Sequence, residues 1–341
     1  GREHGQKADQ LPGYRMIDDP RARDHVAAVW GVPADSLPGK GKPAVELLAS
    51  LGTPGGPRAL LVHGANLRVS APNASAVAAR LEALDLLVVC DVVPSETAAA
   101  ADVVLPVLQW AEEEGTMTSL EGRIIRRRAA ISPPPGPRSE LWVWQQLAAR
   151  LAAPSTWSTD ASEVFDELAR ASAGGRADYS GVSHARLDTG ETIHWPCPAR
   201  EGDPHPGTPR VFLDTFPTPD GRARFHAVEP VDVMPDLGVE RPIHLVTGRV
   251  LAHYQSGAQT RRVAGLVAAA SEPSVDLHPR LAAVHGIEDG DGVVLTSARG
   301  TVRARARLTA AIRPDTVFMA FHWGGPGSVN KVTSDATDPV S

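Results

Sequence analysis

Residues 59–106 read ALLVHGANLRVSAPNASAVAARLEALDLLVVCDVVPSETAAAADVVLP, and their rhythm decides the fold class. Apolar runs and helical patterns alternate along them: Ala59–His63, Ala74–Leu84, Leu86–Val89 and Asp102–Leu105. Short apolar runs predict buried strands, and strands that alternate with helices form parallel sheets. Because further helical patterns lie at 44–51 and 139–152, we predict an α/β doubly wound parallel sheet domain over residues 44–152.

The segments on either side of this domain have less periodic pattern. Residues 1–43 are polar and interrupted by Pro and Gly, so we expect a surface segment that leads into the α/β domain, with a short helix at Ala22–Trp30. Residues 153–237 are rich in Ala, Ser, Gly, Pro and Asp. Here we expect a linker and irregular segment with short strands at Val211–Leu213 and Ala223–His226.

Short strands dominate from residue 238 to residue 341. The patterns are Ile243–Val246, Gly292–Thr296 and Gly300–Leu308, and the turn Ser297–Arg299 separates the last two. We therefore predict a mainly β domain over residues 238–341, a closed barrel of the double-psi type.

The composition excludes several classes of protein. The 341 residues carry a formal charge of −6 with mixed signs, whereas a nucleic-acid-binding protein has a basic stripe. No apolar stretch is long enough to span a bilayer and the start does not resemble a signal peptide, so we expect no membrane partner. The low cysteine content favours a reduced, cytoplasmic location. Two cysteines, Cys90 and Cys197, are too few for a disulfide framework and form no CxxC site. The first residues, GREH, and the last, SDATDPVS, suggest a piece of a longer protein.

Polar residues follow two strands of the predicted parallel sheet. Such sheets bind ligands beyond the carboxyl ends of their strands, where loops 64–70 and 90–96 begin. The amide of Asn66 can donate to and accept from a base edge, and the carboxylate of Asp91 can accept from ribose hydroxyls or guanine nitrogens. Each also has a structural interpretation, Asn66 as a turn residue and Asp91 as a helix cap or turn former.

The loop after the first strand of the β domain has the composition of an anion site. It reads TGRVLAHYQSGAQTRR at residues 247–262. The Thr-Gly pair lets backbone amides approach a ligand without a Cβ in the way, and Arg249, Arg261 and Arg262 carry fork-shaped donors for phosphate or heterocycle edges. The segment therefore suits a large anionic cofactor, although an ordinary basic loop has the same composition.

Several short blocks occur in one order along the chain: GAN at 64–66, SAPN at 70–73, ADVVLP at 101–106, EGT at 114–116, EGR at 121–123, TGR at 247–249, GIEDGD at 286–291 and FHWGG at 321–325. In this order they resemble the C-terminal half of the molybdopterin oxidoreductases of the dimethyl-sulfoxide-reductase type, over essentially the whole chain. Within that family, residues 1–14 and 330–339 are similar to those of the prokaryotic assimilatory nitrate reductases.

The resemblance implies a function and a set of cofactors. It implies a bis-(molybdopterin guanine dinucleotide) cofactor with molybdenum, in an enzyme of nitrate assimilation that reduces nitrate to nitrite by two-electron oxygen-atom transfer. An electron-donor protein or reductase subunit is the implied partner. In this family the protein ligand of the metal and the 4Fe-4S cluster lie in the N-terminal half, so we assign no catalytic residue and no metal ligand and expect this part alone to be inactive. The alternatives are a formate dehydrogenase of the same family and a non-catalytic cofactor-binding or assembly subunit.

The same resemblance assigns cofactor-binding residues. The residues that match the family positions at a guanosine end of the cofactor are Asn66, Cys90 and Asp91. Glu140 matches a family position that carries a carboxylate at the start of its helix. Cys90 stands where the family commonly has Ser, and Glu140 where it often has Asp. Those that match the pterin end are Thr247, Gly248, Arg249, His253, Gln255 and Ser256. Near the metal the match is Phe321 or His322, between which the spacing leaves the choice open, together with Asn330.

Overall fold

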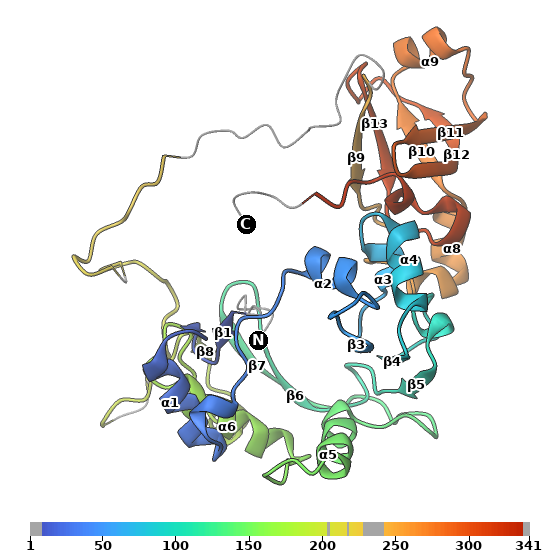
Figure 1. The fold of residues 1–341 in the computed structure, drawn as a ribbon. Helices are drawn as coiled ribbons and strands as arrows, with labels where there is room; N and C mark the ends of the chain where they lie inside the picture. Colours follow the sequence, from blue (N-terminus) through green and yellow to red (C-terminus); the bar gives the residue numbers. More distant parts are fainter. Residues whose placement is uncertain (1–8, 203–204, 217, 228–241, 337–341) are drawn as a thin grey trace. The chain divides into compact units, whose positions relative to one another are not determined.

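The computed structural model describes residues 9–202, 205–216, 218–227 and 242–336. Contacts within the chain define two compact units (Figure 1). One comprises Gly1–Pro43 and Val107–Val228, and the other comprises Ala44–Pro106 and Glu229–Ser341. The unit boundary at residue 43 coincides with a predicted one, whereas the other two boundaries follow residues 106 and 228 and not the predicted 152 and 237.

A parallel sheet of three strands forms the first part of the second unit. Its order is β3 (Ala59–His63), β4 (Leu86–Asp91) and β5 (Val103–Pro106). The helical segments around it are α2 (Ala44–Ser50), α3 (Leu67–Ser70), α4 (Ala74–Glu82) and the 3-10 turn η3 (Ala98–Ala100). The predicted strands and the helix that begins at Ala74 are confirmed, with small shifts at their ends.

Burial of apolar side chains on β4 explains why this sheet forms. Leu87 and Val89 point to one face and are 1% and 0% exposed, in one cluster with Leu81 of α4. Cys90 points to the other face and is also fully buried. Burying one Leu or Val side chain contributes roughly 1.5–3 kcal/mol, so Leu87 and Val89 of this central strand stabilise the sheet on the face that packs against α4.

The second sheet of this unit has five strands, in the order β11 (Gly292–Ser297), β12 (Gly300–Leu308), β10 (Ser274–Leu277), β13 (Thr316–Ala320) and β9 (His244–Gly248). It is mixed, because β10 is parallel to β12 and β9 to β13, whereas the other two pairs are antiparallel. The accompanying helical segments are η4 (Thr260–Arg262), α8 (Ala264–Ala269), α9 (Pro279–His285), η5 (Gly325–Gly327) and η6 (Val329–Lys331). The predicted strands and the turn before Gly300 are confirmed, and β10 and β13 are additional.

The five-stranded sheet curls, and its closure into a barrel stays a prediction. Its two end strands, β9 and β11, line a common cavity of about 540 Å³ together with Val275 and Val317. Among the residues that the structure describes, no ladder joins β9 to β11. The sheet is therefore a half-barrel, and the double-psi connection is not established.

Short strands and helices build the first unit around its own core. Its larger sheet is antiparallel, with the order β6 (Gly115–Thr118), β7 (Arg123–Arg127) and β8 (Ile193–His194), and a small one pairs β1 (Gln10–Leu11) with β2 (Arg15–Met16). Its helical segments are α1 (Pro20–Trp30), η2 (Ala34–Ser36), α5 (Glu140–Arg150), α6 (Ala161–Ser172) and α7 (His184–Asp188). Ile124, Phe165 and Ile193 meet in one buried cluster, which joins the sheet to α6.

Residues 1–43 were expected at the surface, and most of their described side chains are at least partly exposed, but a few apolar ones are buried. Leu11, Ile17, Ala22 and Val26 form a buried cluster. The helix α1 contacts α6, so its apolar face is covered within the first unit. The polar composition of the segment concealed these few apolar positions.

The short strands expected at Val211–Leu213 and Ala223–His226 are wrong. Both segments are irregular in the structure. Phe212 is 55% exposed and Phe225 is 96% exposed. Because these apolar side chains gain little from burial, nothing compensates the entropy of holding the segments extended in a sheet.

We expect Met319→Ala to lower the free energy of unfolding by about 2–5 kcal/mol, the usual cost of truncating a buried Met. Met319 lies on β13 and is fully buried in the cluster that holds the five-stranded sheet together. Val284→Ala is the control, since Val284 on α9 is 79% exposed and its truncation changes stability by less than about 0.5 kcal/mol. Urea unfolding followed by circular dichroism measures both, and equal losses would contradict the assignment of this core.

Candidate functional site

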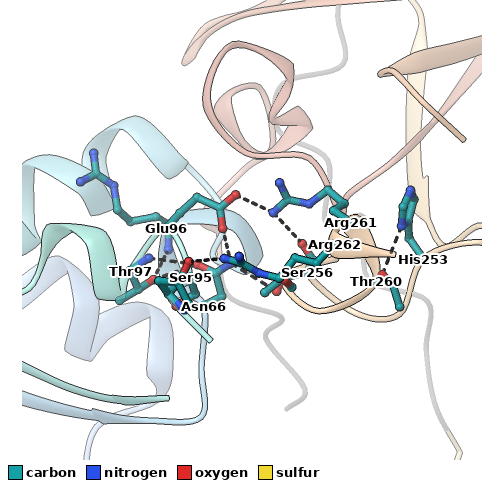
Figure 2. Close-up of polar contacts among 12 residues, drawn as sticks. Asn66, Ser95, Glu96, Thr97, His253, Ser256, Thr260, Arg261 and Arg262 are labelled. Atoms are coloured by element: carbon teal, nitrogen blue, oxygen red, sulfur yellow. Dashed lines mark hydrogen bonds and ion pairs between the residues drawn. The ribbon is translucent and has the colours of Figure 1, made fainter. Parts of the chain in front are cut away.

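Polar side chains from loops after three strands meet in the second unit (Figure 2). Asn66 follows β3 and is 7% exposed. Its Oδ1 accepts hydrogen bonds from the backbone N (3.2 Å) and Oγ1 (3.0 Å) of Thr97, in the loop after β4. Its Nδ2 donates to Oε2 of Glu96 (2.7 Å) and to Oγ of Ser256 (3.3 Å), in the loop after β9. The amide of Asn66 therefore uses its donors and acceptors within the chain.

Cys90 and Asp91, the two predicted cofactor-binding residues at the end of β4, lie among residues of the chain itself. Asp91 accepts hydrogen bonds from the backbone N of Val92 (2.8 Å) and from Oγ of Ser95 (2.7 Å), so it shapes the turn that leads to Glu96. Cys90 is fully buried in the sheet. The turn-forming interpretation of Asp91 thus matches the geometry, and its contact with a guanosine stays a prediction.

The end of β9 presents exposed polar groups. A Cβ on Gly248 would come within 2.6 Å of the Phe318 ring, so only glycine fits here without a shift of that ring. The Arg249 guanidinium lies 5.2 Å from the centroid of the Phe321 ring and donates to Oε1 of Gln255 at 3.2 Å. The structure thus brings Phe321 to Arg249 and Gln255, which the sequence analysis selected from a different segment.

Two histidines and a tryptophan form a cluster beside this loop. The ring centroids of His253 and His322 are 4.4 Å apart, and Trp323 lies 4.9 Å from His322. Both ring nitrogens of His253 are hydrogen-bonded, Nδ1 with Oγ1 of Thr260 (3.1 Å) and Nε2 with the Ala270 carbonyl (2.9 Å). The ring nitrogens of His253 are therefore satisfied inside its own loop, and its contact with a pterin stays a prediction.

His322 differs from its neighbour because its Nε2 is buried and has no hydrogen-bond partner in the described structure. The side chain is 2% exposed. Burial, followed by the nearby charges of His253 and Arg261, lowers the pKa of His322 to about 4. The imidazole is therefore neutral at pH 7, and one of its nitrogens remains available to a ligand.

The remaining predicted residues lie apart from this cluster or bond within the chain. Asn330 donates from Nδ2 to the Val69 carbonyl (2.6 Å) and accepts at Oδ1 from Oγ1 of Thr333 (3.1 Å), so it ties η6 to α3. Glu140 begins α5 in the first unit, after the N-cap Ser139. Their contacts with a cofactor stay predictions.

Glu96 is the central residue that the sequence analysis missed. Its carboxylate joins Asn66 to Arg261, whose guanidinium lies 2.5 Å from Oε1. Arg262 adds a second link, from its guanidinium to the Pro94 carbonyl at 2.8 Å. Glu96 lies in the selected loop 90–96, but no local pattern distinguishes it from a solvated carboxylate.

The described residues contain no metal-binding cluster and no membrane-spanning helix. No group of three or more His, Cys, Asp or Glu side chains among them could hold a metal ion. None of their helices combines the length and the apolar character that a membrane crossing requires.

Two models of known protein families match the chain. Residues 28–150 match the model of the molybdopterin oxidoreductases, and residues 243–341 match that of the molydopterin dinucleotide binding domain. The chain belongs to the molybdopterin oxidoreductase family. The resemblance carried by the ordered sequence blocks is thereby confirmed.

Individual relatives lie in the same family. The chain is 43% identical over 343 residues to the assimilatory nitrate reductase catalytic subunit of Bacillus subtilis, covering 99% of this chain and 48% of that protein. It is 33% identical over 330 residues to the alpha subunit of formate dehydrogenase 1 of Methanococcus maripaludis, covering 96% and 47%. The chain thus spans about half the length of the curated relatives it matches.

A solved structure supports the fold. Acetylene hydratase from Pelobacter acetylenicus superposes with a TM-score of 0.63, at 19% identity, over 93% of this chain and 46% of that one. At this identity the likeness concerns the fold alone. The fold of this chain is therefore one that a solved structure shares.

The buried imidazole of His322 makes stability depend on pH. Its pKa rises from about 4 in the folded chain toward the ordinary 6.5 on unfolding, so the unfolded chain binds the proton more readily. The free energy of unfolding therefore falls as the pH falls from 6.5 to 4, by up to about 3 kcal/mol. Urea unfolding at several pH values measures this slope.

We expect His322→Phe to flatten that slope, because the ring contacts remain while the titrating group is lost. Trp323→Phe is the control, since it keeps the imidazole and should keep the slope. An unchanged pH dependence in His322→Phe would show that other groups cause it.

Proposed function

We propose that this chain is the C-terminal part of a molybdenum-dependent nitrate reductase, which reduces nitrate to nitrite by two-electron oxygen-atom transfer. The observation that carries the proposal is the 43% identity to an assimilatory nitrate reductase catalytic subunit over 99% of the chain. The identity to the formate dehydrogenase alpha subunit is ten points lower, 33% against 43%. The match is spread over both units, so it does not rest on one domain.

The proposed cofactor is bis-(molybdopterin guanine dinucleotide), and the polar groups of the second unit fit a ligand of this kind. Nε2 of His322 and Nε of Arg261 are buried without a hydrogen-bond partner in the described residues. Such atoms typically cost about 1–3 kcal/mol each, which a polar ligand atom would recover. When bound, the cofactor supplies the two-electron redox chemistry.

The proposed roles of the chain's own residues follow from their exposure. Arg249 and Thr247 are exposed at the end of β9, where a cation and a hydroxyl can meet anionic and polar atoms of the pterin end. The neutral imidazole of His322 can donate to or accept from an uncharged pterin atom without an ionic cost. Gln255, beside Arg249, orients that guanidinium.

The other parts of the proposal concern the whole protein. We place the metal's ligand and a 4Fe-4S cluster in the half of the relatives' length that this chain does not span. We also propose an electron-donor protein or reductase subunit as partner and a cytoplasmic location. A formate dehydrogenase remains the second candidate, because the alpha subunit from Methanococcus maripaludis aligns over 96% of the chain.

We expect the full-length protein, purified with its cofactor, to form nitrite from nitrate with reduced viologen as electron donor. It should not oxidise formate with viologen as acceptor. Residues 1–341 alone are the control and should form no nitrite. Formate oxidation without nitrite formation would replace the nitrate proposal by the second candidate.

We expect Arg249→Ala in the full-length protein to lower cofactor retention about tenfold, since one charge-assisted hydrogen bond contributes roughly 1.5–3 kcal/mol. Arg249→Lys should retain an intermediate amount, because an ammonium keeps the charge but not the fork. Molybdenum and pterin per polypeptide after gel filtration measure the effect. Arg305→Ala is the control, since Arg305 pairs with Glu272 at an exposed site on β12. Equal retention in both alanine variants would remove Arg249 from the proposed site.

A further inference from the structure

Loops after four strands converge on the carboxylate of Glu96 (Figure 2). Glu96 follows β4, and its Oε2 accepts a hydrogen bond from Asn66, which follows β3 (2.7 Å). Its Oε1 accepts one from Arg261, which follows β9 (2.5 Å). A Cβ on Gly324, which follows β13, would lie 2.8 Å from the same oxygen. One side chain thus contacts loops from both sheets of the second unit.

The carboxylate is ionised in this position. Burial alone would raise the pKa of Glu96, but hydrogen bonds from Asn66 and Arg261 and the charge of Arg261 outweigh it, so the pKa lies below its ordinary value. The side chains of Arg261 and Glu96 are 24% and 31% exposed, so water screens the pair only in part. A charged hydrogen bond in such surroundings is stronger than one at an open surface.

Arg261 connects Glu96 to the rest of the loop after β9. Its guanidinium also donates to the Ser256 carbonyl at 3.4 Å, and Ser256 Oγ accepts from Asn66. Gly257 has φ +70°, and a Cβ there would come within 2.8 Å of Nε of Arg261. The loop from Ser256 to Arg261 therefore folds closely around its own guanidinium.

We propose that Glu96 is a positioning residue for the cofactor, and this rests on the proposed function. By joining the Asn66 amide to the Arg261 guanidinium, Glu96 sets the distance between the loops after β3 and β4 and the loop after β9 that carries Arg249. Because the Asn66 amide is used within the chain, Asn66 belongs to this positioning network, and its role is to hold the loops in place.

Four variants of the full-length protein test the proposal. Glu96→Ala removes both hydrogen bonds, and Glu96→Gln keeps an acceptor for Asn66 but loses the charge. The double variant Glu96→Arg with Arg261→Glu restores an ion pair with reversed polarity, yet an arginine at position 96 cannot accept from Asn66. Asp276→Ala is the matched control, because Asp276 makes an ion pair of similar length with Arg307 on the neighbouring strand β12 (2.6 Å).

Two measurements separate positioning from general stability. The first is molybdenum and pterin per polypeptide after gel filtration, and the second is the melting temperature of protein made without cofactor. We expect about tenfold lower retention in Glu96→Ala and a smaller loss in Glu96→Gln, with wild-type retention in Asp276→Ala. The double variant should recover the melting temperature of the wild type, but its cofactor retention should stay low, because it lacks both the acceptor for Asn66 and Nε of Arg261, which the proposed function assigns to the cofactor.

Three results would overturn the inference. They are wild-type retention in Glu96→Ala, a loss in Asp276→Ala as large as that in Glu96→Ala, and recovery of retention by the double variant. In each case the wild-type protein still carries its cofactor, so the proposed function stands. A wild-type protein without molybdenum and pterin would overturn the proposed function and this inference together.

Discussion

Parallel strand pairing is the constraint on which the candidate site depends. Because parallel strands end at the same edge of a sheet, pairing β3 with β4 and β9 with β13 brings the following loops to two such edges. Glu96 and Asn66 at one edge then meet Arg261 at the other. A register slip of one residue would turn the buried positions of β4 to the opposite face and displace these loops.

Some polar residues of the site bond within the chain and others are left open to a ligand. The sequence around them does not distinguish these two groups. Asn66, His253 and Asn330 are buried and bond within the chain, so they hold loops together. Arg249 is exposed, and His322 keeps a buried nitrogen without a partner. Buried polar groups need partners, and only the fold decides whether the chain or a ligand supplies them. Resemblance to a family selects positions from both groups alike.

The sequence predicted strands well where their apolar residues are continuous or recur at one regular spacing. The strands Ala59–His63 and Gly300–Leu308 have the bounds expected from the sequence, because alternating or continuous apolar side chains specify a strand directly. Strands whose stability depends on partners far away in the sequence were predicted less well. The sequence analysis missed β10, and it expected strands at Val211–Leu213 and Ala223–His226 that lack burial. The free energy that a segment gains by forming a strand depends on neighbouring strands that are distant in the sequence.

The sequence by itself determined the family, the alternation of strands and helices in residues 59–106, and the loops in which the polar side chains of the candidate site lie. These properties depend on residue type and on short spacings, which a single chain displays in order. The tertiary structure alone decided that residues 44–106 pack with the β domain, and that Glu96 is central while Asn66 is occupied within the chain. The physical reason is that hydrogen-bond satisfaction and burial arise from contacts between residues as far apart as Glu96 and Arg261, which no local pattern records.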